Sequence, residues 1–436
     1  CDRIRFAVSE IPAGQWIRGR GWEAAHRVEG GFPDRAEIDH LTPNHPVALS
    51  SKDGHSIWLN SRALAELSID QSIPDPPGGR YDRRTDGSLT GIALENAADA
   101  IIHQLPPLPD SEKRRLVSNA LPRLHSQGII AVHSFEGLDE FNLFLEMEAR
   151  NELPLRVTAS FNREDFERAL AGKMKPGAAG RRIRLGGLKL YADGALGSRS
   201  AAMFAPYTGE PENYGIVVTE STELIRDAVR AAEHGFPTAI HAIGDKAVRH
   251  ALDALEAARA VAPDLPGMRI EHVQMVQPRD LLRFQAVGIA ASIQPCHMLS
   301  DIDMAERYWS EQTGMRYPYG SLAASGAICV MGSDAPIDDE HPMRNIRGAV
   351  TRRRLSGPWA ERAWIPEECM EIIDALRGYT SFPAMLEGSH RGVLVPGYPA
   401  DVVVLSGNPL VTKPEHLHGV DVETVYLDGE RIFPVV

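Results

Sequence analysis

The sequence has few cysteines, no long apolar run and no excess of positive charge. Its four cysteines (Cys1, Cys296, Cys329 and Cys369) are widely spread over 436 residues and form no Cys-x-x-Cys pair. This spread indicates neither a disulfide framework nor a cysteine-based zinc site, and it suits a reducing compartment. We therefore expect a cytoplasmic protein, although a chain that starts at Cys1 leaves a signal peptide open.

Two further absences narrow the expected partners. No run of about 18 apolar residues occurs, so the sequence predicts no membrane-spanning helix. The net charge of −13 argues against a nucleic-acid partner, because neutralising phosphates requires a basic face. The hydrophobic content of 43% and the charged content of 24% are ordinary globular values. A small-molecule substrate is the expected partner.

From residue 128 onward, short apolar runs alternate with amphipathic helical stretches. The runs are continuous, as in parallel strands that are covered on both faces. The seven runs are Gly128–His133, Leu155–Phe161, Ile183–Tyr191, Pro237–His241, Met268–Val273, Gly288–Gln294 and Ala327–Asp334. Many strand–helix units in a row favour a (β/α)8 barrel or a doubly wound sheet. A closed barrel needs eight strands, and only seven runs are present.

The composition predicts three regions. Residues 1–127 are rich in Pro, Gly and Trp at their start, which is typical of an insertion or lid leading into the barrel. Residues 128–390 form the barrel itself. Residues 391–436 contain short β runs and an Asp428–Gly429 turn, a strong hairpin signal, and predict part of a small antiparallel β-sandwich.

Four of the apolar runs have metal-ligand residues at their ends: Lys189, His241, His272 and Asp334. Active sites of parallel barrels lie at the C-terminal ends of the strands. Imidazoles and a carboxylate suit Zn²⁺ or a similar divalent ion, and Asp334 could accept a proton from metal-activated water. Two alternatives stay open. A strand-end histidine is often a hydrogen-bonded core residue, and a buried lysine is costly unless it is paired or modified.

The motifs around these residues resemble the amidohydrolase superfamily. They are KLYADGALGSRSAAMFAPY, HAIGDKAV, RIEHVQMV and GSDAP, and the terminal GVLVPGYPADVVVLSGNPL is similar to the segment that returns to the small β-sandwich. The resemblance covers nearly the whole chain and is specific to the YtcJ-like branch, which includes N-substituted formamide deformylases. It implies an α/β fold with a (β/α)8 TIM-type barrel.

The resemblance also implies roles for individual residues. Lys189 would be a bridging ligand, N-carboxylated to an anionic carbamate, and His241 and His272 would hold one metal ion. Asp334 would be both metal ligand and proton shuttle, with zinc as the expected cofactor, in one or two ions.

Three residues outside the ligand set are expected to bind substrate. They are His55 in DGHSIWLN, and Asp193 and Arg199 in the loop that follows Lys189. His133, at the end of an earlier run, is expected to be structural.

The sequence departs from the family at the first strand, which normally ends in His-x-His. None of the seven runs ends in that motif, so we expect the first strand to lie upstream of Cys1. Three explanations stay open: a truncated gene model, an upstream part outside this sequence, or a natural variant. An open barrel exposes strand edges, so a stable seven-stranded chain would need a compensating strand or a homo-oligomer. A second metal ion would also lack ligands.

The expected function is hydrolysis of an amide-type C–N bond of a small molecule by metal-activated hydroxide. Two alternatives remain. One is a metal-poor, catalytically incompetent relative or fragment that acts as a binding protein. The other is a deaminase of a cyclic amidine.

Overall fold

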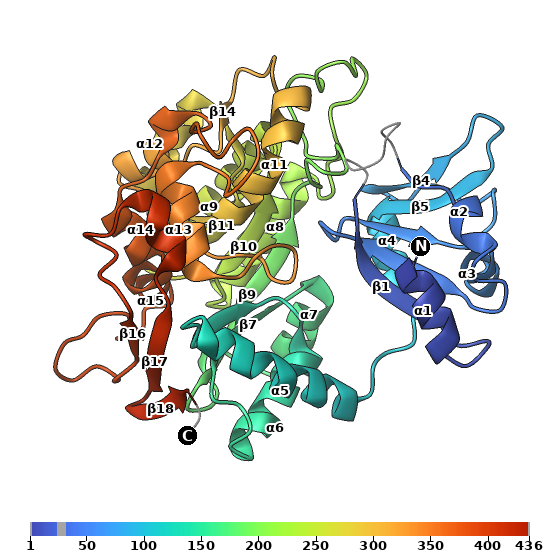
Figure 1. The fold of residues 1–436 in the computed structure, drawn as a ribbon. Helices are drawn as coiled ribbons and strands as arrows, with labels where there is room; N and C mark the ends of the chain where they lie inside the picture. The colour runs from blue at the N-terminus through green and yellow to red at the C-terminus, as the bar shows by residue number, and fades with distance from the viewer. Residues whose placement is uncertain (1, 24–31, 435–436) are drawn as a thin grey trace. The chain divides into compact units, whose positions relative to one another are not determined.

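The computed structural model describes residues 2–23 and 32–434, and these residues form two compact units (Figure 1). Each unit is built from three separate segments of the chain. Unit one consists of Cys1–Pro107, Asp193–Thr219 and Asp303–Gln312, and unit two consists of Leu108–Ala192, Glu220–Ile302 and Thr313–Val436.

Unit two contains a curled sheet of seven parallel strands in the order β15-β13-β11-β10-β9-β7-β6. The strands are β6 (Ala131–Ser134), β7 (Arg156–Phe161), β9 (Ile183–Tyr191), β10 (Thr238–Ala242), β11 (Arg269–His272), β13 (Ala290–Ile293) and β15 (Cys329–Met331). Each strand lies within or overlaps one of the seven predicted runs. The short β8 (Gly177–Ala178) pairs antiparallel with β9. The predicted TIM-type barrel strands are therefore confirmed, with β15 and β6 at the two ends of the path.

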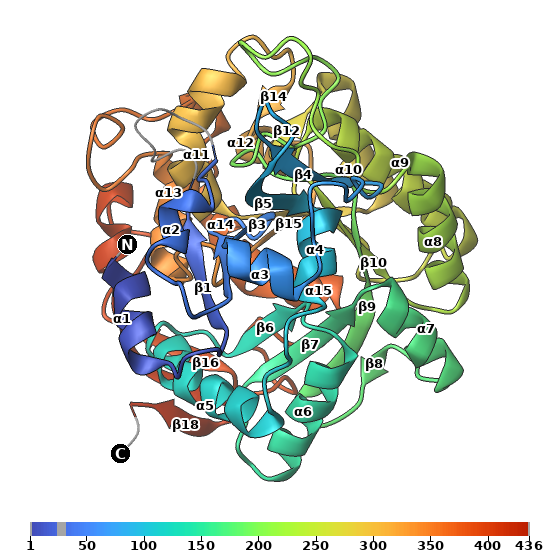
Figure 2. The same cartoon turned by 90° about the vertical axis from the view of Figure 1, so that its right-hand side faces the viewer.

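Helices that alternate with these strands lie around the outside of the curled sheet, as Figure 2 shows for α6 to α9. They bury alanine and leucine side chains against it, as α9 does with Leu252 and Leu255. The helices of unit two are α5 (Asp110–Ser126), α6 (Leu138–Ala149), α7 (Arg163–Ala171), α8 (Ser221–Glu233), α9 (Asp245–Val261), α10 (Leu281–Val287), α12 (Tyr319–Ala324), α13 (Pro342–Thr351), α14 (Ile372–Tyr379) and α15 (Ser381–Leu386). Helix α11 (Pro295–Tyr308) begins in unit two. Shorter elements are η2 (Pro278–Asp280), η3 (Pro366–Glu368), and the paired β12 (Met275–Val276) and β14 (Met315–Arg316).

One glycine allows β9 and β10 to approach closely beside the predicted site. A Cβ atom at Gly187 would lie 1.9 Å from the backbone oxygen of Pro237, so no other residue fits without moving a strand. Two residues later, Lys189 pairs with Ala239 of β10. The close approach therefore helps to fix the position of Lys189 along β9 relative to β10.

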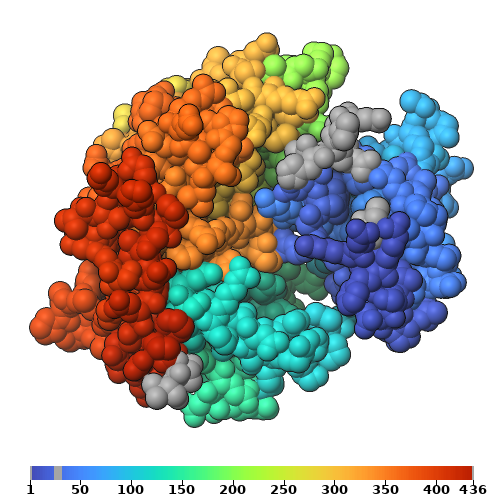
Figure 3. All heavy atoms as spheres, viewed as in Figure 1, coloured from blue at the N-terminus to red at the C-terminus, as the bar shows by residue number. Residues whose placement is uncertain are grey.

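The C-terminal module is a three-stranded antiparallel sheet in the order β16 (Val402–Leu405), β17 (Val422–Leu427) and β18 (Glu430–Phe433), with η4 (Pro414–Gly419) after β16. Asp428 and Gly429 both have positive φ, 55° and 83°, as the predicted tight hairpin requires. Arg156 of β7 forms ion pairs with Asp401, at 2.8 Å, and with Asp428. These pairs join the module, red in Figure 3, to the barrel.

Unit one contains its own five-stranded mixed sheet in the order β1-β2-β3-β5-β4. Its strands are β1 (Ile17–Trp22), β2 (Val47–Ser51), β3 (Ser56–Leu59), β4 (Gly79–Arg83) and β5 (Leu89–Glu95). Its helices are α1 (Asp2–Glu10), α2 (Ala36–Asp39), α3 (Ser61–Glu66) and α4 (Asn96–Ile102). Buried apolar residues such as Ile57, Leu59 and Ile101 form its core. The region boundaries 1–127, 128–390 and 391–436 stay predictions.

No helix among residues 2–23 and 32–434 is both long and apolar enough to cross a bilayer.

Candidate metal centre

The four predicted ligands lie on neighbouring strands of unit two. Lys189 is in β9, His241 in β10 and His272 in β11, and Asp334 follows β15. All three strand residues are buried, with exposed fractions of 5%, 2% and 7%. Because the strands are parallel, their C-terminal ends meet at one edge of the sheet.

Three ligand-type atoms lie together at this edge. A ring nitrogen of His272, a ring nitrogen of His297 and a carboxylate oxygen of Asp334 all lie within 4.8 Å of one another. The two histidines are buried and Asp334 is exposed. The φ angles of His272, Val273 and Asp334 are 78°, 48° and 54°, in the left-handed region that such side chains rarely adopt. Backbone strain of this kind is concentrated at functional sites.

His241 lies beside His272 but outside this trio. Their ring centroids are 4.6 Å apart with an interplanar angle of 65°. The parallel pairing of β10 and β11 places His241 opposite Glu271, the residue before His272. The structure thus brings together both histidines that the sequence predicted.

Lys189 lies between aromatic rings and close to negatively charged side chains. Its Nζ atom lies 4.7 Å from the ring centroid of Phe135 and 4.8 Å from that of Tyr191. Burial lowers the pKa of Lys189 to about 8, although the negative charges of Glu271 and Asp334 raise it in part. The amine therefore loses its proton more readily than an exposed lysine.

A buried chain of polar contacts runs beside Lys189. Arg269 pairs with Glu271 at 2.5 Å and donates to Nδ1 of His133 at 2.9 Å. Because Nδ1 accepts the hydrogen bond from Arg269, the proton of the His133 ring is on Nε2. Nε2 donates it in a hydrogen bond to Glu387, 2.9 Å away. Burial would raise the pKa of Glu387, but the contacts with His133 outweigh it and hold that pKa well below its usual range. Both ring nitrogens of His133 are occupied, as its predicted structural role requires.

The sequence does contain a His-x-His, at His416 and His418. The structure places both histidines in η4 of the C-terminal module, and both are exposed. They do not end a barrel strand and therefore do not replace the family's first-strand pair.

Two of the three predicted substrate-binding residues lie together in unit one. His55 Nδ1 lies 2.8 Å from Glu95 Oε2, and Ser200 donates to the other Glu95 oxygen at 2.5 Å. Burial would lower the pKa of His55, but the charge of Glu95, with help from Asp193, raises it to about 9. Asp193 is fully buried and accepts from the backbone N–H of Ala202 at 2.8 Å.

Arg199 is held by a different set of contacts in unit one. Its Nε atom lies 2.9 Å from Glu210, and its guanidinium lies 5.8 Å from the ring centroid of Phe32 and 5.5 Å from that of Tyr308. Substrate binding by His55, Asp193 and Arg199 stays a prediction.

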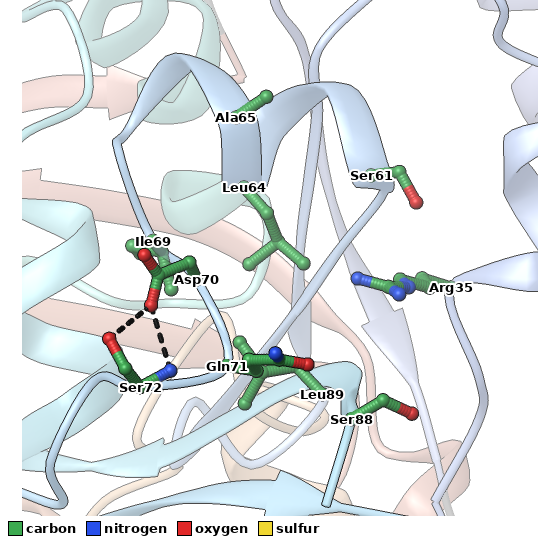
Figure 4. A pocket seen from close by; sticks show the side chains of 10 residues that line it. All are labelled: Arg35, Ser61, Leu64, Ala65, Ile69, Asp70, Gln71, Ser72, Ser88 and Leu89. Atoms are coloured by element: carbon green, nitrogen blue, oxygen red, sulfur yellow. Dashed lines mark hydrogen bonds between the residues drawn. The ribbon is translucent and has the colours of Figure 1, made fainter.

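A surface hollow of about 510 Å³ lies in unit one (Figure 4) and contains none of the predicted site residues. Its lining residues are Arg35, Ser61, Leu64, Ala65, Ile69, Asp70, Gln71, Ser72, Ser88 and Leu89. The Asp70 carboxylate accepts hydrogen bonds from both the N–H and the hydroxyl of Ser72, so it is engaged within its own turn of the chain. The hollow brings no cluster of catalytic groups together.

The donor set at the ends of β11, β13 and β15 fits a divalent cation. Gln294, just after β13, donates its amide N–H to the Ser292 carbonyl, so its Oε1 faces Nδ1 of His272 at 3.0 Å. His272 therefore bears its proton on Nδ1, so Nε2 is the atom through which this ring would bind a metal. Nε2 of His297 is buried without a hydrogen-bond partner among the described atoms. Imidazole nitrogens and a carboxylate are ligands that suit zinc.

Sequence reasoning missed Gln294 and His297. Gln294 is the last residue of the sixth apolar run and His297 follows it, in the segment Gln294-Pro295-Cys296-His297. The rule that identified the other ligands, a polar residue where an apolar run ends, also applies here. His297 was harder to find because it lies in the first turn of α11 rather than on the strand.

Comparisons with known proteins identify the family. A model of the amidohydrolase family matches residues 1–433. Protein LONG AFTER FAR-RED 3 of Arabidopsis thaliana is 32% identical over 100% of this chain and 76% of its own length. The N-substituted formamide deformylase of Arthrobacter pascens is 28% identical over 96% of this chain and 79% of its own length. The crystal structure of an uncharacterized metal-dependent hydrolase from Pyrococcus horikoshii matches 95% of this chain and 80% of its own, with 28% identity and a TM-score of 0.74.

Proposed function

Because the chain belongs to the amidohydrolase family, we propose that it is a metal-dependent hydrolase that cleaves an amide-type C–N bond of a small molecule. The observation that supports this most directly is the meeting of His272, His297 and Asp334 ligand atoms within 4.8 Å at the C-terminal ends of barrel strands. The Pyrococcus relative is described as an uncharacterized metal-dependent hydrolase, and the Arthrobacter relative is named an N-substituted formamide deformylase. Both names support the proposal.

The metal is proposed to be zinc, held by His272 and Asp334, with His241 and Lys189 beside them. When bound, such an ion supplies Lewis acidity that lowers the pKa of water and polarises a carbonyl group. His272 can serve only through Nε2, because Gln294 occupies its other nitrogen. Lys189 is proposed to be N-carboxylated, which would convert a costly buried amine into an anionic ligand.

Asp334 is the proposed proton carrier. Its carboxylate is exposed while the histidines beside it are buried, so it is the member of the group that a substrate can reach. It would accept a proton from the attacking water and donate it to the leaving nitrogen, which otherwise departs as an unstable anion. Such a transfer would serve C–N cleavage, because an amine leaves readily only after protonation.

The test compares the wild-type protein with Asp334→Asn. We expect the wild type to bind close to one equivalent of zinc and to release amine from at least one member of a panel of N-substituted formamides and simple amides. In Asp334→Asn the turnover should fall by about 10²-fold or more while the zinc content changes little. Asp338→Asn, in the same loop, is the matched control and should keep its activity.

Two results would contradict the proposal. Turnover by Asp334→Asn at the wild-type rate would remove its assigned role. A wild-type protein that binds no metal and cleaves no member of the panel would favour the binding-protein alternative.

A further inference from the structure

We propose that His297 is a ligand of the same metal ion as His272 and Asp334. The inference rests on the proposed metal-dependent function and adds a ligand from the start of α11, which follows β13. None of the motifs that identified the other ligands contains His297.

The fold fixes the position of His297 at the start of α11. The helix begins directly after β13, and the His297 N–H donates to the Gln294 carbonyl at 3.1 Å. One residue earlier, the Cys296 N–H donates to Oδ1 of Asn345 at 2.8 Å. These two bonds hold the backbone at His297 close to the end of β13.

The His297 ring is buried but incompletely satisfied. The residue is 8% exposed, and its Nε2 atom has no hydrogen-bond partner among the described atoms. A buried polar atom without a partner is destabilising, so native proteins rarely contain one without a ligand or a functional reason. A cation between His297, His272 and Asp334 would supply that partner.

The neighbouring ring is already prepared for the same ion. His272 and His297 are nearly parallel, at 14°, with centroids 5.7 Å apart. Gln294 orients His272, and the same short segment after β13 supplies His297. One turn of chain therefore supplies a ligand and positions another.

A second trio, Cys296, His297 and Asp338, also has ligand atoms within 4.8 Å. Its other two members are already engaged. Asp338 accepts from Ser300 at 2.6 Å, and the Cys296 thiol points at the Ser333 carbonyl, 3.6 Å away. Binding a metal there would break these contacts, so the proposal commits to the trio with His272 and Asp334.

The experiment measures zinc binding by the full chain and three variants. Affinity is obtained by competition with a chromogenic chelator, and stoichiometry by elemental analysis. His297→Gln should weaken zinc binding at least about tenfold, because even loss of a group that only orients a ligand costs about 10–100-fold. His341→Gln is the matched control: its Nδ1 is also buried without a partner, but His341 belongs to neither trio. Cys296→Ser tests the competing trio.

Cobalt substitution gives a second readout that is independent of turnover. The visible absorption of bound Co²⁺ should change in His297→Gln and stay unchanged in His341→Gln and Cys296→Ser. Circular dichroism confirms that each variant is folded.

The outcomes are distinct. Wild-type zinc affinity and cobalt spectrum in His297→Gln would overturn the inference, and a raised KM alone would make His297 a substrate contact instead. Weakened binding in Cys296→Ser would favour the other trio and also overturn it. A wild-type chain that binds no metal would contradict the proposed function itself. Metal binding that is unchanged in His297→Gln would contradict only this inference.

Discussion

The Nδ1 atom of His272 lies 3.0 Å from the Oε1 atom of Gln294, so the residue after one barrel strand orients the ring that ends the neighbouring strand. This bond fixes both the tautomer and the plane of the imidazole. Since β11 and β13 pair in parallel, the contact follows from the register of the sheet. The ligand and its supporting group are thus positioned by the same hydrogen-bond ladder.

Replacement of Gln294 should therefore weaken the metal site without touching a ligand. We expect Gln294→Leu to reduce zinc affinity about 10–100-fold, because His272 loses the acceptor that holds its proton on Nδ1. Gln294→Glu should keep or raise the affinity, since a carboxylate accepts the same proton. Chelator competition measures both.

Gln277→Leu is the control for Gln294. Gln277 also belongs to unit two and donates to Asp245 at 2.5 Å, and Asp245 is outside the predicted ligand set. Equal zinc affinity in Gln294→Leu and Gln277→Leu would contradict the orienting role.

The strands and the family were predictable because their signals are local. Seven continuous apolar runs correspond to seven parallel strands, and the motifs identified the amidohydrolase family, which the comparisons confirm. The Asp428–Gly429 turn was equally clear, because only a few residue pairs tolerate positive φ at both positions. These features depend on residues that are close together in the sequence.

What the sequence did not reveal depends on contacts between distant segments. His133 is occupied by Arg269 and Glu387, which lie far along the chain and leave no trace in local patterning. Unit one likewise combines its first residues with Asp193–Thr219 and Asp303–Gln312. A pattern of hydrophobicity within one window cannot report such pairings.

The environment of Lys189 predicts opposite effects on stability and metal binding. Lys189→Met replaces a buried amine by a chain of similar length between two aromatic rings. The metal-free variant should be as stable as the wild type or more stable, by up to about 2 kcal/mol in urea unfolding. Its zinc affinity should fall, because the thioether cannot be carboxylated.

Lys189→Glu and Lys246→Met complete this comparison. The glutamate supplies a carboxylate at nearly the same position and should recover part of the zinc affinity. Lys246, a half-buried lysine of α9, is outside the site, so its replacement should leave zinc binding unchanged. Wild-type zinc affinity in Lys189→Met would show that Lys189 is not a ligand.

The pair of His55 and Glu95 predicts a loss of stability at alkaline pH. The pKa of His55 is raised from 6.5 to about 9 because Glu95 outweighs the effect of burial. A group whose pKa is higher in the folded state stabilises the fold fully at pH values below its unfolded-state pKa. That contribution to the free energy of unfolding is lost as the pH rises through the folded-state pKa. The contribution is therefore complete below about pH 6.5 and absent above about pH 9. A difference of about 2.5 units corresponds to roughly 3 kcal/mol at the low-pH end.

Urea unfolding of the wild type and Glu95→Gln across this range measures the contribution. The stability advantage of the wild type should be largest near pH 6 and shrink by about 3 kcal/mol as the pH passes 9. Glu66→Gln is the control, because the hydrogen bond that Glu66 accepts comes from the indole of Trp16, which does not titrate in this range. Its difference from the wild type should not change with pH. The charge on the His55 imidazole is what makes the pair depend on pH. If the difference in unfolding free energy between the wild type and Glu95→Gln stays constant from pH 6 to above 9, Glu95 does not hold the proton on His55.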